Sequence, residues 1–217
     1  GNAVIVPPSP KGLGVSQMLV DFIHAELRKC HLPVDLVQSL PSPISKALTA
    51  ELMRQADLVV ATGSQANVRM AYTCGTPAFG VGAGNVASII DSSADAQQAA
   101  SLIIASKTFD NATSCSSENS MVVLDAIRGD MLKAMSDRGA LLLTSDEKAR
   151  LQSVMSKNGK LSEVITGKSA QVIAQLSEID WRGRIALDVP TVLMVEETGV
   201  GYDHPFSGEK LSPVLTV

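Results

Sequence analysis

Residues Leu58–Tyr72 read LVVATGSQANVRMAY and combine an apolar strand, a tight turn and a helix. The run Leu58–Ala61 is continuously apolar, which is typical of a strand buried on both faces of a parallel sheet. The turn Thr62–Ser64 holds a glycine and a serine, and we expect a helix over Gln65–Tyr72 directly after it. A strand that leads into a helix through so short a turn is half of a βαβ unit, and it predicts an α/β fold.

The same alternation continues on both sides, with apolar residues recurring every three or four positions in the helices. Upstream, we expect strands at Ala3–Val6 and Val34–Val37 and helices at Ser16–Lys29 and Pro43–Gln55. Downstream, the expected strands are Ala78–Gly84, Ser88–Asp91, Ser120–Asp125, Thr191–Glu196 and Leu211–Val217. The expected helices there are Ala94–Ser106, capped by Ser92 or Ser93, then Ile127–Ser136, a helix capped by Ser145, and Ser169–Leu176. Repeated units of this length predict parallel strands with right-handed crossovers.

Composition narrows the class of protein. The chain has 217 residues, of which 45% are hydrophobic and 18% charged, so we expect one large or two small globular domains. A net charge of −4 gives no electrostatic reason to expect nucleic acid or an anionic membrane as a partner. Strand-like sequence at both ends leads us to expect a fragment of a longer polypeptide.

The three cysteines are Cys30, Cys74 and Cys115, an odd number without a CxxC pair. This favours a reducing compartment over a disulfide framework or a metal site. We interpret Cys30 and Cys74 as packing residues. Cys115 lies in KTFDNATSCSSENS (107–120), among small hydroxyl residues between an expected helix and an expected strand, where backbone N–H groups can approach a thiol. That setting suits a nucleophile, although a free cysteine is more often buried and inert, and both interpretations stay open at this point.

Two loops could meet a dinucleotide. The turn Thr62–Ser64 precedes a helix, where free N–H groups favour phosphate, and the segment Gly80–Gly84 allows a ligand close to the backbone. Neither loop has the GxGxxG pattern of dinucleotide-binding proteins, so a simple tight turn is the alternative for each.

Five motifs in order give the chain a resemblance to the middle of an aldehyde dehydrogenase, and most closely to the CoA-acylating branch. The motifs are GNAVIVPPSP, ATGSQANV, GTPAFGVGAGN, SKTFDNATSC and EKLSPVL. The resemblance implies an α/β fold with part of a Rossmann-like NAD(P)-binding domain in residues 1–84 and an α/β catalytic, thiol-bearing domain in residues 85–217. It also implies that the isolated chain is inactive or nearly so.

The resemblance also implies residue roles. Cys115 falls on the catalytic nucleophile of the family, and Glu209 on the glutamate that binds the nicotinamide ribose. Leu211 falls on the residue that packs near the nicotinamide ring. The other implied cofactor-binding residues are Ser9 at the adenine ribose, Gly63 and Ser64 at the pyrophosphate, and Val81 and Gly82 at the nicotinamide pocket. Pro7 and Pro10 replace the lysine and glutamate typical of the hydrolytic branch, so the resemblance leaves NAD and NADP open.

One departure from the hydrolytic members concerns the base. In hydrolytic members, the motif that corresponds to Gly80–Asn85 begins with a glutamate that activates water. Here Gly80 stands in the place of that glutamate. A general base of this kind contributes about 10²–10⁴-fold to a rate, so hydrolysis of an acyl-enzyme should be slow and the thiol of CoA should take its place. The expected reaction is therefore conversion of an aldehyde, CoA and NAD(P)⁺ to acyl-CoA and NAD(P)H.

Several alternatives and lesser candidates remain. A hydrolytic aldehyde or semialdehyde dehydrogenase would need another base, and a non-catalytic nucleotide-binding fragment would have an unreactive Cys115. His204 is a candidate for binding substrate or CoA, whereas Glu118 and Asp110 are first of all local hydrogen-bonding groups. The expected partners are the aldehyde and CoA, with no nucleic acid, membrane or metal. We expect a homo-oligomer when full length, located in the cytoplasm or inside a bacterial microcompartment.

Overall fold

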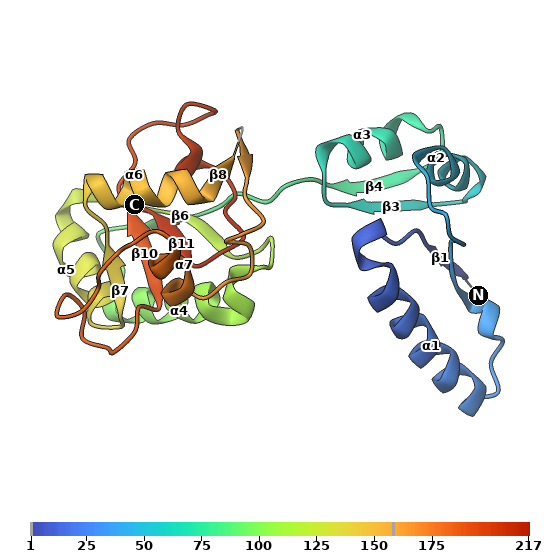
Figure 1. The fold of residues 1–217 in the computed structure, drawn as a ribbon, viewed down its shortest axis with the longest axis horizontal. Coiled ribbons are helices and arrows are strands. Elements are labelled where there is room, and N and C mark those ends of the chain that lie inside the picture. The colour runs from blue at the N-terminus through green and yellow to red at the C-terminus, as the bar shows by residue number, and fades with distance from the viewer. Residues whose placement is uncertain (1, 158) are drawn as a thin grey trace. The chain divides into compact units, whose positions relative to one another are not determined.

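The computed structural model describes residues 2–157 and 159–217, and the chain divides into two compact units between Gly82 and Ala83 (Figure 1). The division lies two residues before the expected boundary at residue 84. In the part of the chain that the structure describes, no helix is long and apolar enough to cross a bilayer. No group of three or more potential metal ligands occurs among the described residues.

The first unit is built from two pairs of parallel strands. The strands β1 (Val4–Val6) and β2 (Val37–Ser39) form one pair, and β3 (Val59–Thr62) and β4 (Ala78–Val81) form the other. The helices are α1 (Leu13–Lys29), α2 (Lys46–Gln55) and α3 (Gln65–Thr73), with short 3₁₀ turns at Pro10–Gly12 and Val34–Leu36. Ser45 and Ser64 cap α2 and α3 by accepting a hydrogen bond from the backbone N–H three residues on.

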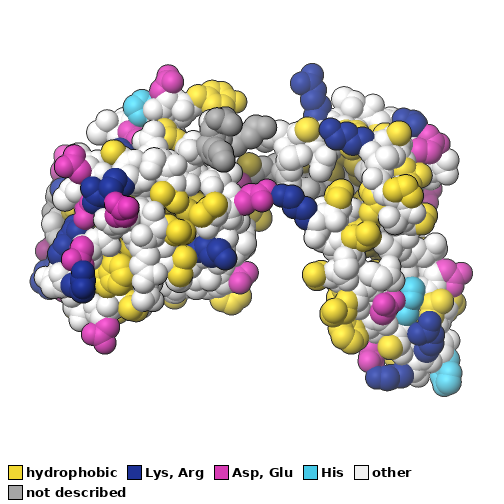
Figure 2. Space-filling model, in the orientation of Figure 1, with side chains coloured by type: hydrophobic (Ala, Val, Ile, Leu, Met, Phe, Trp, Pro, Cys, Tyr) yellow, Lys and Arg dark blue, Asp and Glu magenta, His cyan; other side chains and the backbone are white. Residues whose placement is uncertain are grey.

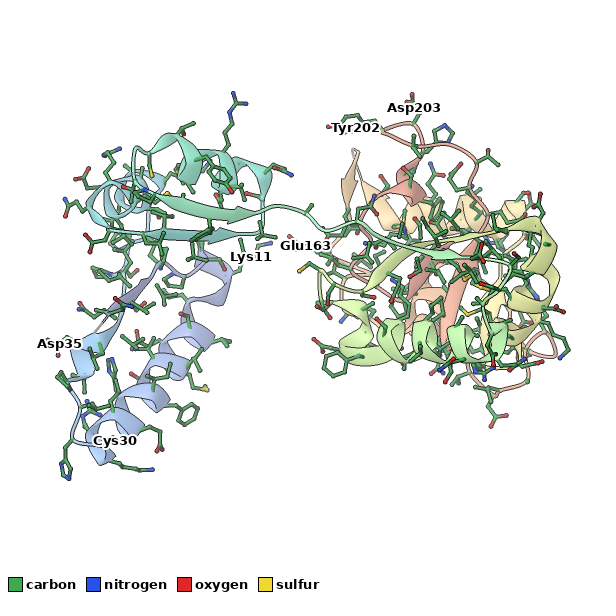
Figure 3. All side chains as sticks on the ribbon, turned by 180° about the vertical axis from the view of Figure 1, so that it is seen from behind. Lys11, Cys30, Asp35, Glu163, Tyr202 and Asp203 are labelled. Carbon is green, nitrogen blue, oxygen red and sulfur yellow. The ribbon has the colours of Figure 1, made fainter. Side chains whose placement is uncertain are left out.

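Three predictions for this unit are wrong in detail. Val34–Leu36 is a 3₁₀ turn rather than a strand, because Pro33 precedes it and the strand pairing begins only at Val37. The strand β3 is not buried on both faces within its unit: Val59 and Ala61 are buried, whereas Val60 is 71% exposed. Cys30, taken as a packing residue, is exposed at the end of α1 (Figure 3).

The second unit holds a five-stranded sheet with every described pairing parallel, in the order β5-β6-β11-β10-β7. Its strands are β5 (Val86–Ile90), β6 (Glu118–Val123), β7 (Ala140–Leu142), β10 (Val192–Val195) and β11 (Val214–Thr216). Its helices are α4 (Ala96–Thr108), α5 (Asp125–Ser136), α6 (Ser145–Met155) and α7 (Ala170–Leu176). Two-residue strands β8 (Ser156–Lys157) and β9 (Lys160–Leu161) pair antiparallel after α6.

Helices cover both faces of this sheet, as the alternation along β10 shows. Val192 and Met194 pack in one core cluster with residues of α4 and α5, whereas Leu193 and Val195 pack in another with residues of α6 and α7. A strand covered on both faces should be apolar throughout, and all four residues of β10 are buried. The predicted α/β fold with parallel strands is therefore confirmed.

The caps of two helices differ from the prediction. Asp95, not Ser92 or Ser93, caps α4, because its carboxylate accepts hydrogen bonds from the N–H groups of Gln97 and Gln98. Thr144, not Ser145, caps α6 in a reciprocal box with Glu147. Neither β7 nor the β8–β9 pair was predicted, since a strand of three residues and a pair of two-residue strands show little periodicity.

Candidate active site

Cys115 lies exposed on the loop that joins the 3₁₀ turn Phe109–Ala112 to β6. Three successive residues before it, Asp110 to Ala112, have positive φ values between 47° and 57°, a conformation uncommon for residues other than glycine. The Asn111 side chain donates to the Gly167 carbonyl at 3.0 Å. This hydrogen bond to a distant segment anchors the strained loop. Backbone strain of this kind is concentrated at functional sites.

Hydrogen bonds between serine hydroxyls and between backbone groups stabilise the turn that contains Cys115. The Ser117 N–H donates to the Ser114 carbonyl at 3.1 Å, and the hydroxyls of Ser114 and Ser116 share a hydrogen bond of 2.9 Å. Within the described part of the chain, the Cys115 N–H donates to no oxygen. An exposed sulfur beside a free amide donor is an arrangement that a carbonyl compound can approach.

Gly84 brings Cys115 and Glu209 together. A Cβ atom at Gly84 would lie 2.4 Å from the Cys115 carbonyl oxygen and 3.2 Å from its Cβ, so only glycine fits against the Cys115 loop. The Gly84 N–H donates to Glu209 Oε1 at 3.1 Å, which fixes the carboxylate. Two of the predicted site residues, 94 positions apart in the sequence, therefore meet at one backbone segment.

Leu211 belongs to the same network. It has φ 42°, and its carbonyl accepts a hydrogen bond from the Gly167 N–H at 3.0 Å. Gly167 in turn receives the Asn111 side chain, so the loop before Cys115 and the segment after Glu209 share one anchor. Gly167 was not predicted to take part, although a lone glycine outside a helix is a signal for such a backbone position.

Two lysines are buried beneath this network. Lys210 is fully buried, and its ammonium donates to the carbonyls of Phe206 and Gly208 at 2.6 and 2.9 Å. Burial, together with the positive charge of Lys107, lowers the pKa of Lys210 to about 7. Burial lowers the pKa of Lys107 to about 8, and the carboxylate of Glu118 partly offsets that effect. Neither lysine was predicted, because a charged residue in an apolar pattern is usually read as a solvated one.

His204 forms a chain of polar contacts with Glu197 and Lys148. Its Nδ1 lies 2.9 Å from Glu197 Oε1, and Lys148 Nζ lies 3.0 Å from Glu197 Oε2. Burial alone would raise the pKa of Glu197, but hydrogen bonds from Lys148 and His204 lower it to about 2. The lesser candidate Asp110 instead makes a local contact, its carbonyl accepting the Thr113 hydroxyl.

In the first unit, the structure brings four predicted cofactor residues to one end of a strand pair. Thr62 pairs with Val81, so Gly63 and Ser64 follow the carboxyl end of β3 beside Val81 and Gly82 at the end of β4. Gly63 has φ 104° with no atom within 4 Å of a built Cβ, and Ser64 caps α3. Carboxyl ends of parallel strands are where α/β proteins bind nucleotides, and this bare backbone at a helix start fits a pyrophosphate. Ser9 follows β1, where its hydroxyl accepts the Gly12 N–H.

Gly80 lies under the ring of Tyr72. The Tyr72 hydroxyl accepts the Gly80 N–H at 2.9 Å and lies 3.2 Å from the Gly80 carbonyl. A Cβ at Gly80 would lie 2.7 Å from both the Tyr72 ring and a Val68 methyl group. No side chain, and therefore no carboxylate base, fits at this position without a shift of Tyr72 or Val68.

Comparison with known proteins gives a consistent result. The model of the aldehyde dehydrogenase family matches residues 1–178. A sulfoacetaldehyde dehydrogenase (acylating) of Cupriavidus necator is 64% identical over 217 residues, which is 100% of this chain and 43% of that relative. The chain thus spans less than half the length of this curated relative.

Solved structures agree. An acetylating aldehyde dehydrogenase from Geobacillus thermoglucosidasius superposes with a TM-score of 0.90 at 36% identity, over 99% of this chain and 47% of that one. A propionaldehyde dehydrogenase from Rhodopseudomonas palustris, described with bound CoA and an acylated cysteine, gives a TM-score of 0.81 at 25% identity, over 99% and 48% of the two chains. The family match over most of the chain, with the fold in agreement, shows that this chain belongs to the aldehyde dehydrogenase family.

Proposed function

We propose that this chain acts in a CoA-acylating aldehyde dehydrogenase, which converts an aldehyde, CoA and NAD⁺ or NADP⁺ to acyl-CoA and NAD(P)H. The observation that carries the proposal is that the chain has an exposed thiol at Cys115 and, in the first unit, a glycine at position 80 whose surroundings leave no room for a side chain. A thioester can form on the thiol, and no carboxylate at position 80 can activate water to hydrolyse it.

The first step is addition of the Cys115 thiolate to the aldehyde carbonyl. The carbon–oxygen double bond becomes a single bond, and the negative charge develops on the oxygen. The N–H of Cys115, which has no acceptor among the described residues, is a donor for that charge. The strained loop and its anchor at Gly167 keep the sulfur and this N–H in a fixed relation, which lowers the entropy that must be lost before reaction.

A bound NAD(P)⁺ would supply the acceptor for the hydride of the carbon that is bonded to Cys115 Sγ. We propose that Gly63, Ser64, Val81 and Gly82 hold it in the first unit and that Ser9 contacts its adenine ribose. Glu209 is proposed to bind the nicotinamide ribose, and Leu211 to pack near the nicotinamide ring. The hydrogen bond from Gly84 occupies only one carboxylate oxygen of Glu209, which leaves the other for a ribose hydroxyl.

The aldehyde that we propose is sulfoacetaldehyde. The support is the 64% identity, across this whole chain, to the relative named for that substrate. We propose that the full-length protein forms a homo-oligomer. We also propose that it is located in the cytoplasm or in a bacterial microcompartment, since its three cysteines are unpaired.

Product analysis on the full-length protein tests the proposal. The protein is mixed with sulfoacetaldehyde, NAD⁺ or NADP⁺, and CoA, and the products are separated and weighed by mass spectrometry. We expect sulfoacetyl-CoA in an amount equal to the reduced cofactor. Sulfoacetate as the first product, with CoA unchanged, would identify a hydrolytic enzyme, and absence of any reduced cofactor would favour a non-catalytic chain.

A further inference from the structure

Two exposed serine residues flank Cys115 in the sequence. Ser114, Cys115 and Ser116 are all exposed in the turn that Ser117 closes by donating its N–H to the Ser114 carbonyl. The hydroxyl oxygens of Ser114 and Ser116 lie 2.9 Å apart, so both side chains reach the same side of the turn. The steps proposed above for Cys115 use neither hydroxyl.

The hydrogen bonds within this hydroxyl pair leave one donor free. Each hydroxyl has one hydrogen and two lone pairs. Ser114 Oγ accepts the Ser116 N–H at 3.4 Å, and one hydroxyl of the pair donates to the other. Whichever serine donates, one hydroxyl hydrogen therefore has no acceptor among the described residues. An anion with two oxygens can also replace the mutual hydrogen bond and accept from both hydroxyls.

The side chains around the pair leave it to a ligand. Among the described residues, no Lys, Arg, Asp or Glu side chain is hydrogen-bonded to Ser114, Cys115 or Ser116. The neighbouring hydroxyl of Thr113 donates to the backbone carbonyl of Asp110 and not to a carboxylate. The turn thus presents neutral donors beside an exposed thiol. A hydrogen bond from such a donor is stronger when its acceptor is ionised.

The proposed substrate carries its charge close to its reacting carbon. In sulfoacetaldehyde, two covalent bonds separate the sulfonate sulfur from the carbonyl carbon. When that carbon is bonded to Cys115 Sγ, the sulfonate oxygens must lie close to the thiol. Consecutive Cα atoms are about 3.8 Å apart, so side chains next to Cys115 in the chain are within reach of the sulfonate. Ser114 and Ser116 hold these two positions.

We propose that the hydroxyls of Ser114 and Ser116 bind the acid group of the aldehyde and select a substrate with an anion on its α-carbon. The inference rests on the proposed function and deepens it by naming the residues that determine the substrate. Two donors 2.9 Å apart can each bind one oxygen of the same sulfonate. A site that hydrogen-bonds a polar group of its substrate discriminates against analogues that lack the group.

Substrate selectivity of the full-length enzyme tests this assignment. The measured quantity is the ratio of kcat/KM for sulfoacetaldehyde to kcat/KM for propionaldehyde, in which a methyl group replaces the sulfonate. We expect the ratio to fall about 10-fold in Ser114→Ala and in Ser116→Ala, and about 100-fold in the double variant, because each change removes a hydrogen bond to a charged group. Loosening of the turn affects both aldehydes and cancels in the ratio. Ser114→Thr and Ser116→Thr keep a hydroxyl and should keep most of the selectivity.

A binding measurement without turnover accompanies the kinetics. Iodoacetamide alkylates an exposed thiol, and mass spectrometry follows the reaction at Cys115. Ethanesulfonate, which has the sulfonate but no aldehyde, should slow this alkylation in the wild type, because an anion bound at the two hydroxyls covers the thiol. The double variant should show no protection. Ser101→Ala, which removes an exposed hydroxyl of α4, is the matched control and should keep both the ratio and the protection.

The outcomes distinguish the serine assignment from the proposed function. If the wild type forms no acyl-CoA, or uses both aldehydes equally well, the proposed reaction or its substrate is wrong, and the serine assignment with it. If the wild type prefers sulfoacetaldehyde but the alanine variants keep its ratio, the serine assignment alone is wrong.

A lysine provides the alternative that the same measurement would detect. Lys168 is exposed and follows Gly167, where a Cβ atom would lie 3.6 Å from the Thr113 hydroxyl oxygen. We expect Lys168→Met to keep most of the selectivity of the wild type. A fall of the ratio in Lys168→Met, without a fall in the serine variants, would show that an ion pair binds the sulfonate and would overturn the serine assignment.

Discussion

At the scale of single residues, Cys115 differs from the other cysteines by its setting rather than by its exposure. Cys30 is exposed as well, but it ends a helix, whereas Cys115 follows three residues with positive φ and packs against Gly84. We expect Cys115→Ser in the full-length enzyme to lower the rate of NAD(P)H formation by about 10³-fold or more. Mass spectrometry after mixing with aldehyde and cofactor should show no acyl adduct. Cys30→Ser is the control, and an adduct that survives in Cys115→Ser would contradict the assignment.

Gly84 offers a second test at this scale. In Gly84→Ala the added methyl group meets the backbone oxygen of Cys115 at 2.4 Å, and backbone cannot move aside as a flexible side chain can. A misplacement of this size should lower kcat/KM by about 100-fold. Gly129→Ala within α5 is the matched control, because a Cβ there has no neighbour within 4 Å. Wild-type kcat/KM in Gly84→Ala would show that this contact does not position the nucleophile.

The buried Lys210 predicts a pH dependence of stability. Its pKa is about 7 in the folded chain and about 10.4 in an unfolded one, so between these values the unfolded state binds more protons. The free energy of unfolding should therefore rise as the pH increases from 7 to 9. Lys107, with a pKa of about 8, acts in the same direction. In Lys210→Met the rise between pH 7 and pH 9 should be smaller, as measured by denaturant titration. An equal rise in both proteins would mean that Lys210 is charged in the folded state throughout.

At the scale of elements, the start of a helix shows how local contacts determine which of two adjacent residues acts as the N-cap. Both Thr144 and Ser145 can cap a helix, and the sequence does not distinguish them well. In the structure, the Glu147 carboxylate accepts a hydrogen bond from the Thr144 N–H, and Arg184 of a distant segment donates to the same carboxylate. The Thr144-x-x-Glu147 spacing of a capping box therefore favours Thr144 locally, and the Arg184 contact, made only after folding, adds to it.

The cap gives a direct prediction. Thr144→Ala should lower the free energy of unfolding by about 1 kcal/mol, because it leaves an N–H group of α6 without its acceptor. Ser145→Ala, one residue further on and exposed, should change it by less than about 0.5 kcal/mol. Denaturant titration of both variants checks the prediction, and a larger effect at Ser145 would restore the cap expected from the sequence.

The sequence alone also did not show which apolar faces of helices and strands are exposed. The periodic apolar residues of α1 predicted an apolar stripe, and of these Met18, Leu19 and Phe22 are exposed. Figure 2 shows hydrophobic side chains on the surface over this helix. Periodicity reports that a face is apolar and does not report what covers it. The same reason explains why Val60 of β3 is exposed although its strand is continuously apolar.

At the scale of the whole molecule, the alternation of strands and helices was sufficient to predict an α/β fold. It was not sufficient to predict the strand order β5-β6-β11-β10-β7, in which the last strand enters the middle of the sheet. Motifs mark Cys115 and Glu209 as candidate site residues, and their roles stay predictions. Contacts between distant segments were not expected, as at Gly167 and Lys107 and in the contact of Glu197 with the candidate His204. Motifs record local chemistry, whereas these contacts exist only in the folded chain.

The central claim is that CoA, and not water, releases the acyl group from Cys115. The most direct measurement is the amount of NAD(P)H formed by the full-length enzyme with excess aldehyde, first without CoA and then with it. We predict a rapid burst of about one NAD(P)H per active site without CoA, followed by a plateau, and continuous turnover once CoA is added. Continuous turnover of many equivalents before CoA is added would contradict the account, because a base that activates water would then have to exist.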